Sequence, residues 1–231
     1  MQSDVLSFWD RAEAGRQLAQ HLMIYAAQRP VILALPRGGV PVAYEVAKAL
    51  RAPLDLIFVR KIGAPGQAEF GLGAVVDGAH PQIVLNEDAL DHVRVPPGYI
   101  EEETQRQLQE IERRREHYLA GRCPVDVAGR VAIVVDDGIA TGGTVRAALK
   151  GLSRARPSRL ILAVPVAPAD TIERLRAEAD EVVCLMTPEP FYAVGEHYDD
   201  FRQTSDREVT TLLDEAQRWT KEDAHERHQS S

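Results

Sequence analysis

Residues 131–144 have the sequence Val131-Ala132-Ile133-Val134-Val135-Asp136-Asp137-Gly138-Ile139-Ala140-Thr141-Gly142-Gly143-Thr144. The first five residues are apolar, which is typical of a strand buried on both faces of a parallel sheet. Two carboxylates follow the strand, and a loop of small and polar residues then leads into a helical pattern. In open parallel sheets, ligands bind beyond the carboxyl ends of the strands. This stretch therefore predicts both an α/β fold and the place of its ligand site.

Short apolar runs alternate with helical patterns on both sides of this stretch. The predicted strands are residues 31–35, 54–59, 131–135, 159–164 and 181–185, and the predicted helices are 41–51, 143–155 and 169–179. The alternation predicts an open, mostly parallel twisted sheet flanked by helices. Residues 72–76 and 83–85 form a further expected strand pair, with Asp77-Gly78 at the turn.

Three segments lie outside the alternation, and we expect helices at 8–28, 99–120 and 207–218, the last followed by a frayed tail. Helix 99–120 is long and highly charged, with a narrow apolar stripe. Its arginines are interleaved with glutamates, so we expect it to pack on an edge of the fold or on a subunit partner, without binding nucleic acid. We find no repeat or long linker. The chain is predicted to be one domain, 1–231, with a core at 31–187, an inserted helical segment at 86–121 and an extension at 188–231.

Composition excludes several classes of protein. The 231 residues include 35 acidic and 27 basic side chains, a net charge of −8, which argues against a protein that coats nucleic acid or an anionic membrane. No apolar run approaches the roughly 20 residues of a membrane span, and no export signal is visible at the start. Cys123 and Cys184 are isolated, which fits a reducing cytoplasm better than a disulfide or zinc framework. We expect a cytoplasmic enzyme that binds neither nucleic acid nor membranes.

The loop after the two carboxylates has the chemistry of a phosphate site. Backbone N–H groups, two threonine hydroxyls and a helix N-terminus suit a phosphate, and Gly142 and Gly143 allow close approach. Adjacent carboxylates can accept hydrogen bonds from vicinal hydroxyls or reach Mg²⁺. No Gly-Lys-Ser/Thr follows, so this is not a Walker A loop. The competing interpretation is an ordinary strand–loop–helix connection with an incidental Asp-Asp, which would require many polar and glycine positions to coincide.

This segment resembles the type I phosphoribosyltransferases, whose hallmark is an apolar strand, two acidic residues and a Thr-Gly-x-Thr loop. The resemblance covers most of residues 31–187. It implies that Asp136 and Asp137 contact the ribose hydroxyls of phosphoribosyl pyrophosphate (PRPP). It also implies that the 5′-phosphate is held by Ala140, Thr141, Gly142, Gly143 and Thr144. Gly138 departs from the family pattern, in which an apolar residue is usual, without removing a ligand group.

Two further segments support the resemblance. Pro36-Arg37-Gly38-Gly39 follows the first strand and matches the family's pyrophosphate loop, which often has a cis peptide. By itself this segment is equally consistent with an ordinary strand-to-helix turn. Arg60 and Lys61 begin a Gly/Pro-punctuated loop, 61–71, that looks like the family's flexible lid over PRPP. The alternative for these two cations is the base of a solvated loop. The match is nearest to uncharacterised predicted phosphoribosyltransferases, whose acceptors are generally not assigned.

The resemblance implies transfer of the 5-phosphoribosyl group of PRPP to a nitrogenous base, with release of pyrophosphate and a requirement for Mg²⁺. The implied catalytic residues are Asp136, Asp137, Arg37 and Lys61, with Arg60, Gly38 and Gly39 also binding substrate. Asp136 and Asp137 would reach Mg²⁺ directly or through water. Ala140 stands where 6-oxopurine enzymes have an aspartate, which disfavours that subclass and leaves adenine, orotate, uracil or another nucleophile open. Candidate acceptor contacts are Phe191, Tyr192 and His197, and Tyr198 is a further aromatic residue. For each of the three aromatic rings, packing against the core or a dimer contact is equally consistent, and His197 is a candidate acid or base.

Two other functions remain open at this point. A PRPP-binding regulator without turnover would keep the Asp-Asp loop, although the net charge and the complete pyrophosphate loop and lid argue against it. Hydrolysis or phosphorolysis of a nucleotide at the same site is the other. The resemblance also leads us to expect a homodimer, whereas the identity of the acceptor and the role of the acidic C-terminal tail do not follow from the residues.

Overall fold

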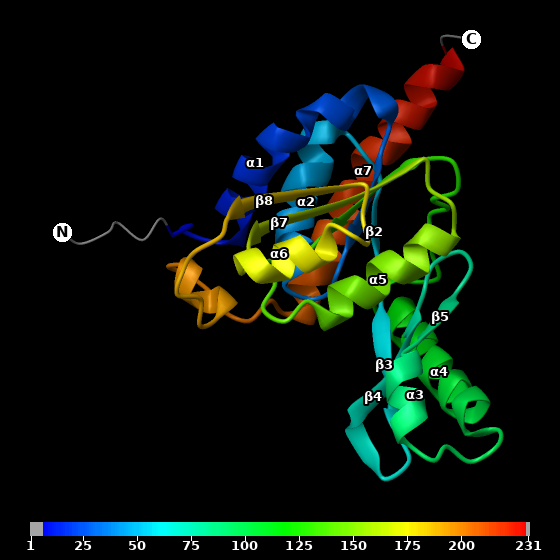
Figure 1. Cartoon of the computed structure of the whole chain (residues 1–231). Helices are drawn as coiled ribbons and strands as arrows, with labels where there is room; N and C mark the ends of the chain where they lie inside the picture. Colours follow the sequence, from blue (N-terminus) through cyan, green and yellow to red (C-terminus); the bar gives the residue numbers. More distant parts are fainter. Residues whose placement is uncertain (1–6, 230–231) are drawn as a thin grey trace.

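The computed structural model describes residues 7–229 and has a five-stranded, fully parallel sheet at its centre (Figure 1). The strand order is β2-β1-β6-β7-β8. Their bounds are β1 Val31–Ala34, β2 Leu54–Leu56, β6 Val131–Val135, β7 Arg159–Val166 and β8 Glu181–Met186. Each predicted strand is present, although the strand expected at 54–59 ends at Leu56 and Val59 begins a strand of a second sheet. The prediction of an open, mostly parallel sheet flanked by helices is confirmed.

Alternate residues of the central strands face two separate cores. Ile133 of β6 packs beneath α1 (Arg11–Leu22), α2 (Gly39–Leu50) and α7 (Asp206–Gln229), whereas its neighbour Val134 packs beneath α5 (Gly143–Arg154) and α6 (Ala169–Leu175). All five residues of β6 are buried. Burial on both faces explains the continuous apolar run, because a strand with one solvated face would alternate.

A second unit projects from this layered body as an arm (Figure 1). It contains a three-stranded antiparallel sheet in the order β3-β4-β5 and two helices. The bounds are β3 Val59–Ala64, β4 Gln67–Val76, β5 Gln82–Leu85, α3 Glu87–His92 and α4 Tyr99–Leu119. The strand pair expected at 72–76 and 83–85 is confirmed. The expected loop at 61–71 is instead most of the β3–β4 hairpin, because Gly66 in the left-handed region (φ 73°) reverses the chain sharply.

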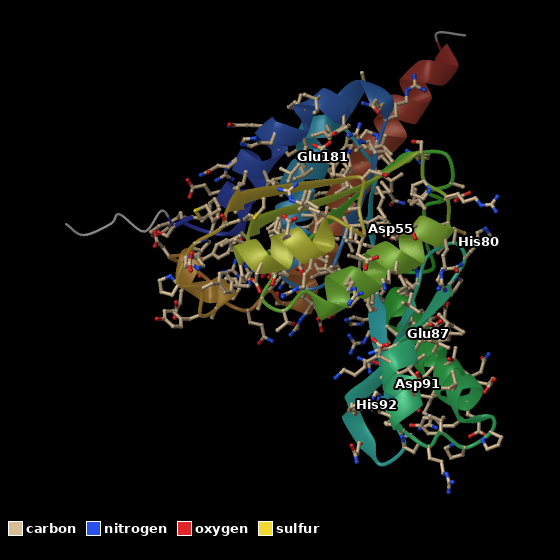
Figure 2. All side chains as sticks on the ribbon, in the orientation of Figure 1. Asp55, His80, Glu87, Asp91, His92 and Glu181 are labelled. Carbon is tan, nitrogen blue, oxygen red and sulfur yellow. The ribbon has the colours of Figure 1, made fainter. Side chains whose placement is uncertain are left out.

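A buried charge cluster joins the arm to the body. Arg115 of α4 lies 2.6 Å from Asp77, at the end of β4, and 3.3 Å from Asp55 of β2. Each of the three side chains is less than one-tenth exposed. Asp55 lies where the body meets the arm, whereas Glu87, Asp91 and His92 lie within the arm (Figure 2). The long charged helix, α4, therefore packs on an edge of the fold. The sequence analysis expected it either there or on a subunit partner.

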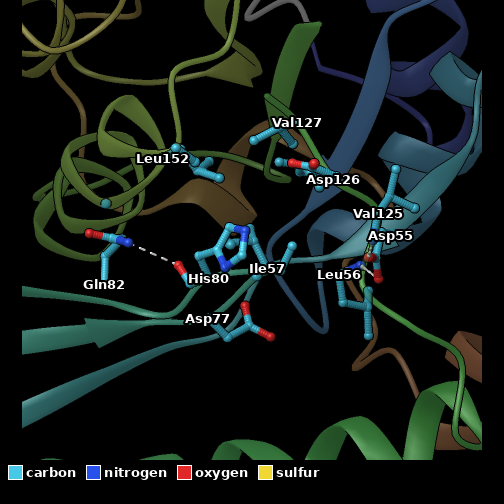
Figure 3. A pocket seen from close by; sticks show the side chains of 15 residues that line it. Asp55, Leu56, Ile57, Asp77, His80, Gln82, Val125, Asp126, Val127 and Leu152 are labelled. Carbon is cyan, nitrogen blue, oxygen red and sulfur yellow. Dashed lines mark hydrogen bonds between the residues drawn. The ribbon is translucent and has the colours of Figure 1, made fainter. Parts of the chain in front are cut away.

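Cavities flank this cluster on two sides. One of about 20 Å³ has room for about one water molecule and is lined by apolar side chains and by the polar side chains of Asp55, Asp77, His80, Gln82 and Asp126 (Figure 3). The other, of about 530 Å³, lies between α4 and residues 121–124. Neither is lined by Asp136 or Asp137.

Several helix bounds differ from the expected ones. Helix 8–28 is divided into α1 and a 3₁₀ helix, η1 (Met23–Gln28), and a second 3₁₀ helix, η2, spans Val194–His197. Helix α6 ends at Leu175, and α7 continues to Gln229, where a frayed tail was expected. The packed face of α7 continues past the expected end at residue 218, because Trp219 packs against the core and its indole donates to the carbonyl oxygen of Ala52 at 3.1 Å. Within the described residues, no helix is long and apolar enough to span a membrane.

Candidate functional site

The acidic pair and the loop after β1 lie in direct contact. Asp136 and Asp137 follow β6, and β1 is hydrogen-bonded beside β6, so the two strand ends meet at the same edge of the sheet. A Cβ atom at Gly38 would lie 2.1 Å from Oδ2 of Asp137, and one at Gly39 would lie 2.8 Å from the carbonyl oxygen of Val135. Glycine is required at both positions because of this approach. The peptide between Pro36 and Arg37 is cis, as the resemblance led us to expect.

The two carboxylates share a partly buried environment. The N–H group of Asp137 donates to Oδ1 of Asp136 at 2.9 Å. Oδ2 of Asp137 accepts a 2.7 Å hydrogen bond from Nε of Arg11, and the hydroxyl of Tyr198 donates to its carbonyl oxygen. Burial and then the charge of Asp137 raise the pKa of Asp136 well above its usual value. Such a pair favours a ligand that brings positive charge or hydrogen-bond donors to it.

The proposed phosphate loop crosses from the acidic pair to the start of α5. Gly142 has a positive φ of 78° and immediately precedes the helix, so the N-terminal N–H groups of α5 face the loop. Thr141, Gly143 and Thr144 are exposed. The hydroxyl of Thr171 on α6 donates to the carbonyl oxygen of Ala140 at 3.0 Å and braces the loop from behind. The loop therefore presents donors toward solvent, as an anion site requires.

The predicted cations are distributed over two units. Arg37 lies on the pyrophosphate loop, where its Nη1 is 3.2 Å from Oδ1 of Asp206, the first residue of α7. Lys61 is exposed on β3 in the arm. Arg60, also on β3, donates to Oε1 of Gln107 on α4 at 3.0 Å. The structure thus places Arg37 against the start of α7 and Arg60 against the arm's own helix.

The predicted acceptor residues have different environments. Tyr192 is 75% exposed. The ring of Phe191 stacks on His197 with 5.3 Å between centroids, and His197 is 4% exposed with no hydrogen-bond partner for either ring nitrogen among the described residues. Tyr198 packs between Phe8 and Phe201, so its ring is occupied by core contacts. Tyr192 is therefore the one of these rings with most of its surface open to a ligand.

Gly138, the departure from the family pattern, has a packing explanation. A Cβ atom there would lie 2.4 Å from Cγ1 of Val194 and 3.0 Å from Cγ1 of Val166. Val194 begins the 3₁₀ helix that covers this end of the site. The space that a side chain at position 138 would fill is taken by the C-terminal extension.

Sequence reasoning missed three residues that the structure brings to the site: Arg11, Phe201 and Asp206. Arg11 contacts Asp137, Phe201 stacks on Arg11, and Asp206 contacts Arg37. No local pattern signals these contacts, because each partner lies more than 100 positions away in the sequence. Clustering of aromatic residues in the predicted extension was the only signal available for Phe201.

The carboxylates were also tested as a magnesium site. Mg²⁺ is usually bound by one or two carboxylates together with substrate phosphates and water. Asp136 and Asp137 each use one oxygen in the hydrogen bonds above, and a side-chain hydrogen bond between the two carboxyl groups adds to the rise in the pKa of Asp136. No group of three or more ligating side chains was found in the described part of the chain. The donor set fits Mg²⁺ that is held mainly by the ligand.

Comparison with known proteins gives three findings. Residues 10–200 match the family described as "Phosphoribosyl transferase domain". The Mycobacterium tuberculosis protein "Putative phosphoribosyl transferase Rv0571c" is 47% identical over 212 residues, which cover 91% of this chain and 47% of that protein. The chain thus spans about half the length of that curated relative. The crystal structure of TT1426 from Thermus thermophilus is 44% identical, with a TM-score of 0.78 over 90% of this chain and 97% of that one.

Proposed function

The chain belongs to the phosphoribosyl transferase domain family, and from this membership we propose that it transfers the 5-phosphoribosyl group of PRPP to a nitrogenous base. Pyrophosphate is the leaving group, and Mg²⁺ is required. The observation that carries the proposal is the contact between the acidic pair and the loop after β1. Gly38 and Gly39 let that loop touch Asp137 and the backbone around Asp136. Groups suited to a sugar diol and to a phosphate therefore lie side by side.

In this proposal the residues act mainly by position and charge. Asp136 and Asp137 accept hydrogen bonds from the ribose hydroxyls, and the loop at Thr141–Thr144 binds the 5′-phosphate with its N–H groups and hydroxyls. Arg37 stabilises the departing pyrophosphate, with Lys61 and Arg60 as further cations carried by the arm. Mg²⁺, when bound, offsets the charge of the pyrophosphate. The bond between ribose C1 and the pyrophosphate oxygen breaks, and a ring nitrogen of the acceptor forms the new bond to C1.

The acceptor is proposed to bind beneath the C-terminal extension. Tyr192 offers an exposed ring for stacking, and Phe191 and His197 of the same extension form a stacked pair. Ala140, which stands where 6-oxopurine enzymes have an aspartate, has no group that could exchange a proton with N7 of a 6-oxopurine. We therefore expect adenine or a pyrimidine to be accepted in preference to a 6-oxopurine.

The test is calorimetric titration of PRPP with and without Mg²⁺, followed by measurement of pyrophosphate release with a panel of bases. Asp136→Asn is expected to weaken PRPP binding at least tenfold, because a charge-assisted hydrogen bond contributes about 1.5–3 kcal/mol. Asp126→Asn is the matched control, since Asp126 is exposed and precedes the strand that Asp136 follows. Unchanged binding in Asp136→Asn would contradict the proposal. Binding without turnover of any base would point to a PRPP sensor.

A further inference from the structure

The side chain of Arg11, at the start of α1, is held on three sides. Its Nε donates to Oδ2 of Asp137 at 2.7 Å, and its Nη1 donates to the carbonyl oxygen of Arg202 at 2.8 Å. Its guanidinium carbon lies 3.9 Å from the centroid of the Phe201 ring. The side chain is 11% exposed and that of Asp137 is 15% exposed. With two hydrogen bonds and a stacked face, the guanidinium has one orientation.

This contact balances charge at the acidic pair. Among residues 7–229, Arg11 is the cation that is hydrogen-bonded to one of the two adjacent carboxylates. Without it, Asp136 and Asp137 would repel each other in a partly buried place. The guanidinium occupies Oδ2 of Asp137 and leaves Oδ1 as the oxygen that can accept a hydroxyl. Arg11 therefore fixes which oxygen faces a ligand, in addition to offsetting one negative charge.

Tyr198 and Arg202 show that the arrangement is assembled from both ends of the described chain. Phe8 pairs with Tyr198 through backbone hydrogen bonds, and the Tyr198 hydroxyl donates to the carbonyl oxygen of Asp137. Segment 198–202 thus makes two contacts with this site. Tyr198 holds the backbone of Asp137, and Arg202 and Phe201 hold Arg11, which binds the side chain of Asp137. An ion pair that served only to attach α1 to the sheet would not need this second set of contacts.

We propose that Arg11 is a positioning residue of the phosphoribosyl site, which sets the orientation of Asp137 for the ribose hydroxyls. This inference rests on the function proposed above. Arg11 acts through Asp137 and contacts no reacting atom, so its loss affects PRPP binding through the geometry of that carboxylate. The same contact makes Asp137 a poor direct ligand for a divalent cation, because a guanidinium already lies 2.7 Å from Oδ2.

The experiment compares Arg11→Gln and Arg11→Lys with wild type in the full chain. Arg16→Gln is the matched control, because Arg16 lies on the same helix, is 57% exposed and is 3.7 Å from Glu45. Dissociation constants for PRPP with Mg²⁺ are measured by calorimetry, and KM and kcat with an accepted base. Arg11→Gln is expected to raise the dissociation constant and KM for PRPP roughly 10- to 100-fold, as loss of a charge-assisted hydrogen bond does. Arg11→Lys, which keeps the charge and loses the planar fork, is expected to lie between wild type and Arg11→Gln.

Coupling to Asp137 separates positioning from general stabilisation. In an Asp137→Asn background, Arg11→Gln is expected to change the PRPP dissociation constant less than twofold, because the carboxylate it positions is gone. Should Arg11→Gln fail to fold, Arg11→Lys decides: a dissociation constant raised at least threefold supports the inference, and a wild-type value overturns it.

The outcomes distinguish the two proposals. If wild type binds PRPP and Arg11→Gln binds it equally well, the positioning inference is wrong and the proposed function stands. If wild type binds no PRPP, the proposed function fails and this inference fails with it. Weaker binding in Arg11→Gln that persists undiminished with Asp137→Asn also overturns the inference, since the effect would not act through Asp137.

Discussion

Replacing Arg115 with methionine tests the charge cluster that joins the arm to the body. Arg115, Asp55 and Asp77 are 7%, 5% and 4% exposed, and Arg115 hydrogen-bonds to both carboxylates. Methionine fills similar volume but leaves two buried carboxylates without their cation. Removing one partner of a buried ion pair costs about 3–5 kcal/mol. For a chain of this length that corresponds to a fall in melting temperature of about 10 °C.

The pH dependence of this loss has a definite sign. Burial raises the pKa of Asp77 to about 6 in the folded protein, and Arg115 opposes that rise. Without Arg115 the folded pKa of Asp77 moves further above its unfolded value of about 3.9, so the folded state binds this proton more tightly than the unfolded state does. Stability is then retained below about pH 4 and lost as the pH rises through the folded pKa. Arg115→Met is therefore expected to cost less at pH 4.5 than at pH 8, by the share of the loss that comes from Asp77.

The assay is urea unfolding at the two pH values. Arg113→Met on the same helix is the control. Arg113 pairs with Glu110 but is 69% exposed, so this variant should unfold at the same urea concentration as wild type. Adding Asp77→Asn to Arg115→Met should remove most of the pH dependence, because the titrating carboxylate is gone. A loss below about 1 kcal/mol at pH 8 would refute the reasoning, since that value is typical of an exposed ion pair. An equal loss at both pH values would refute the role of Asp77.

Three further predictions concern the site. Gly38→Ala places a Cβ atom 2.1 Å from an oxygen of the acidic pair and should weaken PRPP binding at least tenfold by calorimetry; unchanged affinity would show that the loop can withdraw. Gly138→Ala meets Val194 and should cost about 1–3 kcal/mol in urea unfolding, which the added Val194→Ala should largely restore; failure of that rescue would contradict the packing explanation. Asp206→Asn releases Arg37 from an exposed ion pair and should lower KM for PRPP about two- to threefold in initial-rate assays, whereas a higher KM would show that Asp206 orients Arg37.

Local sequence patterns predicted the central sheet and the two segments that meet at the candidate site. The apolar run at 131–135 was sufficient to predict the buried strand, and the carboxylates after it were sufficient to predict the place of the site. Both predictions depend only on residues that are neighbours in the sequence. The Pro36–Gly39 loop was found from its glycines, whose requirement the structure explains by the approach of Asp137. These features depend on short stretches of chain and on rules that hold in any parallel sheet.

Contacts between distant residues were not predictable in the same way. Arg11 shares its helix with one other arginine and Arg115 shares its helix with three, and only the tertiary structure selects the one that faces inward. The segment 61–71 has the glycines and proline of a loop, yet antiparallel pairing with its own neighbour makes it a hairpin. Propensity is a weak guide where tertiary pairing supplies the hydrogen bonds.

The pairing of Phe8 with Tyr198 also has a consequence for the order of folding. The bond between Arg11 and Arg202 joins residues 191 positions apart, and the entropy lost on closing a loop grows with its length. During synthesis, all five strands of the sheet emerge before residue 198. The body can therefore form before Tyr198 and Arg202 make their contacts with Asp137 and Arg11. In the folded protein, we expect the pairing between Phe8 and the segment around Tyr198 to open before the sheet does. The amide hydrogens of Asp199 and Asp200 should therefore exchange with solvent faster than those of β6. Ligand binding would then protect a segment that is made after the whole central sheet.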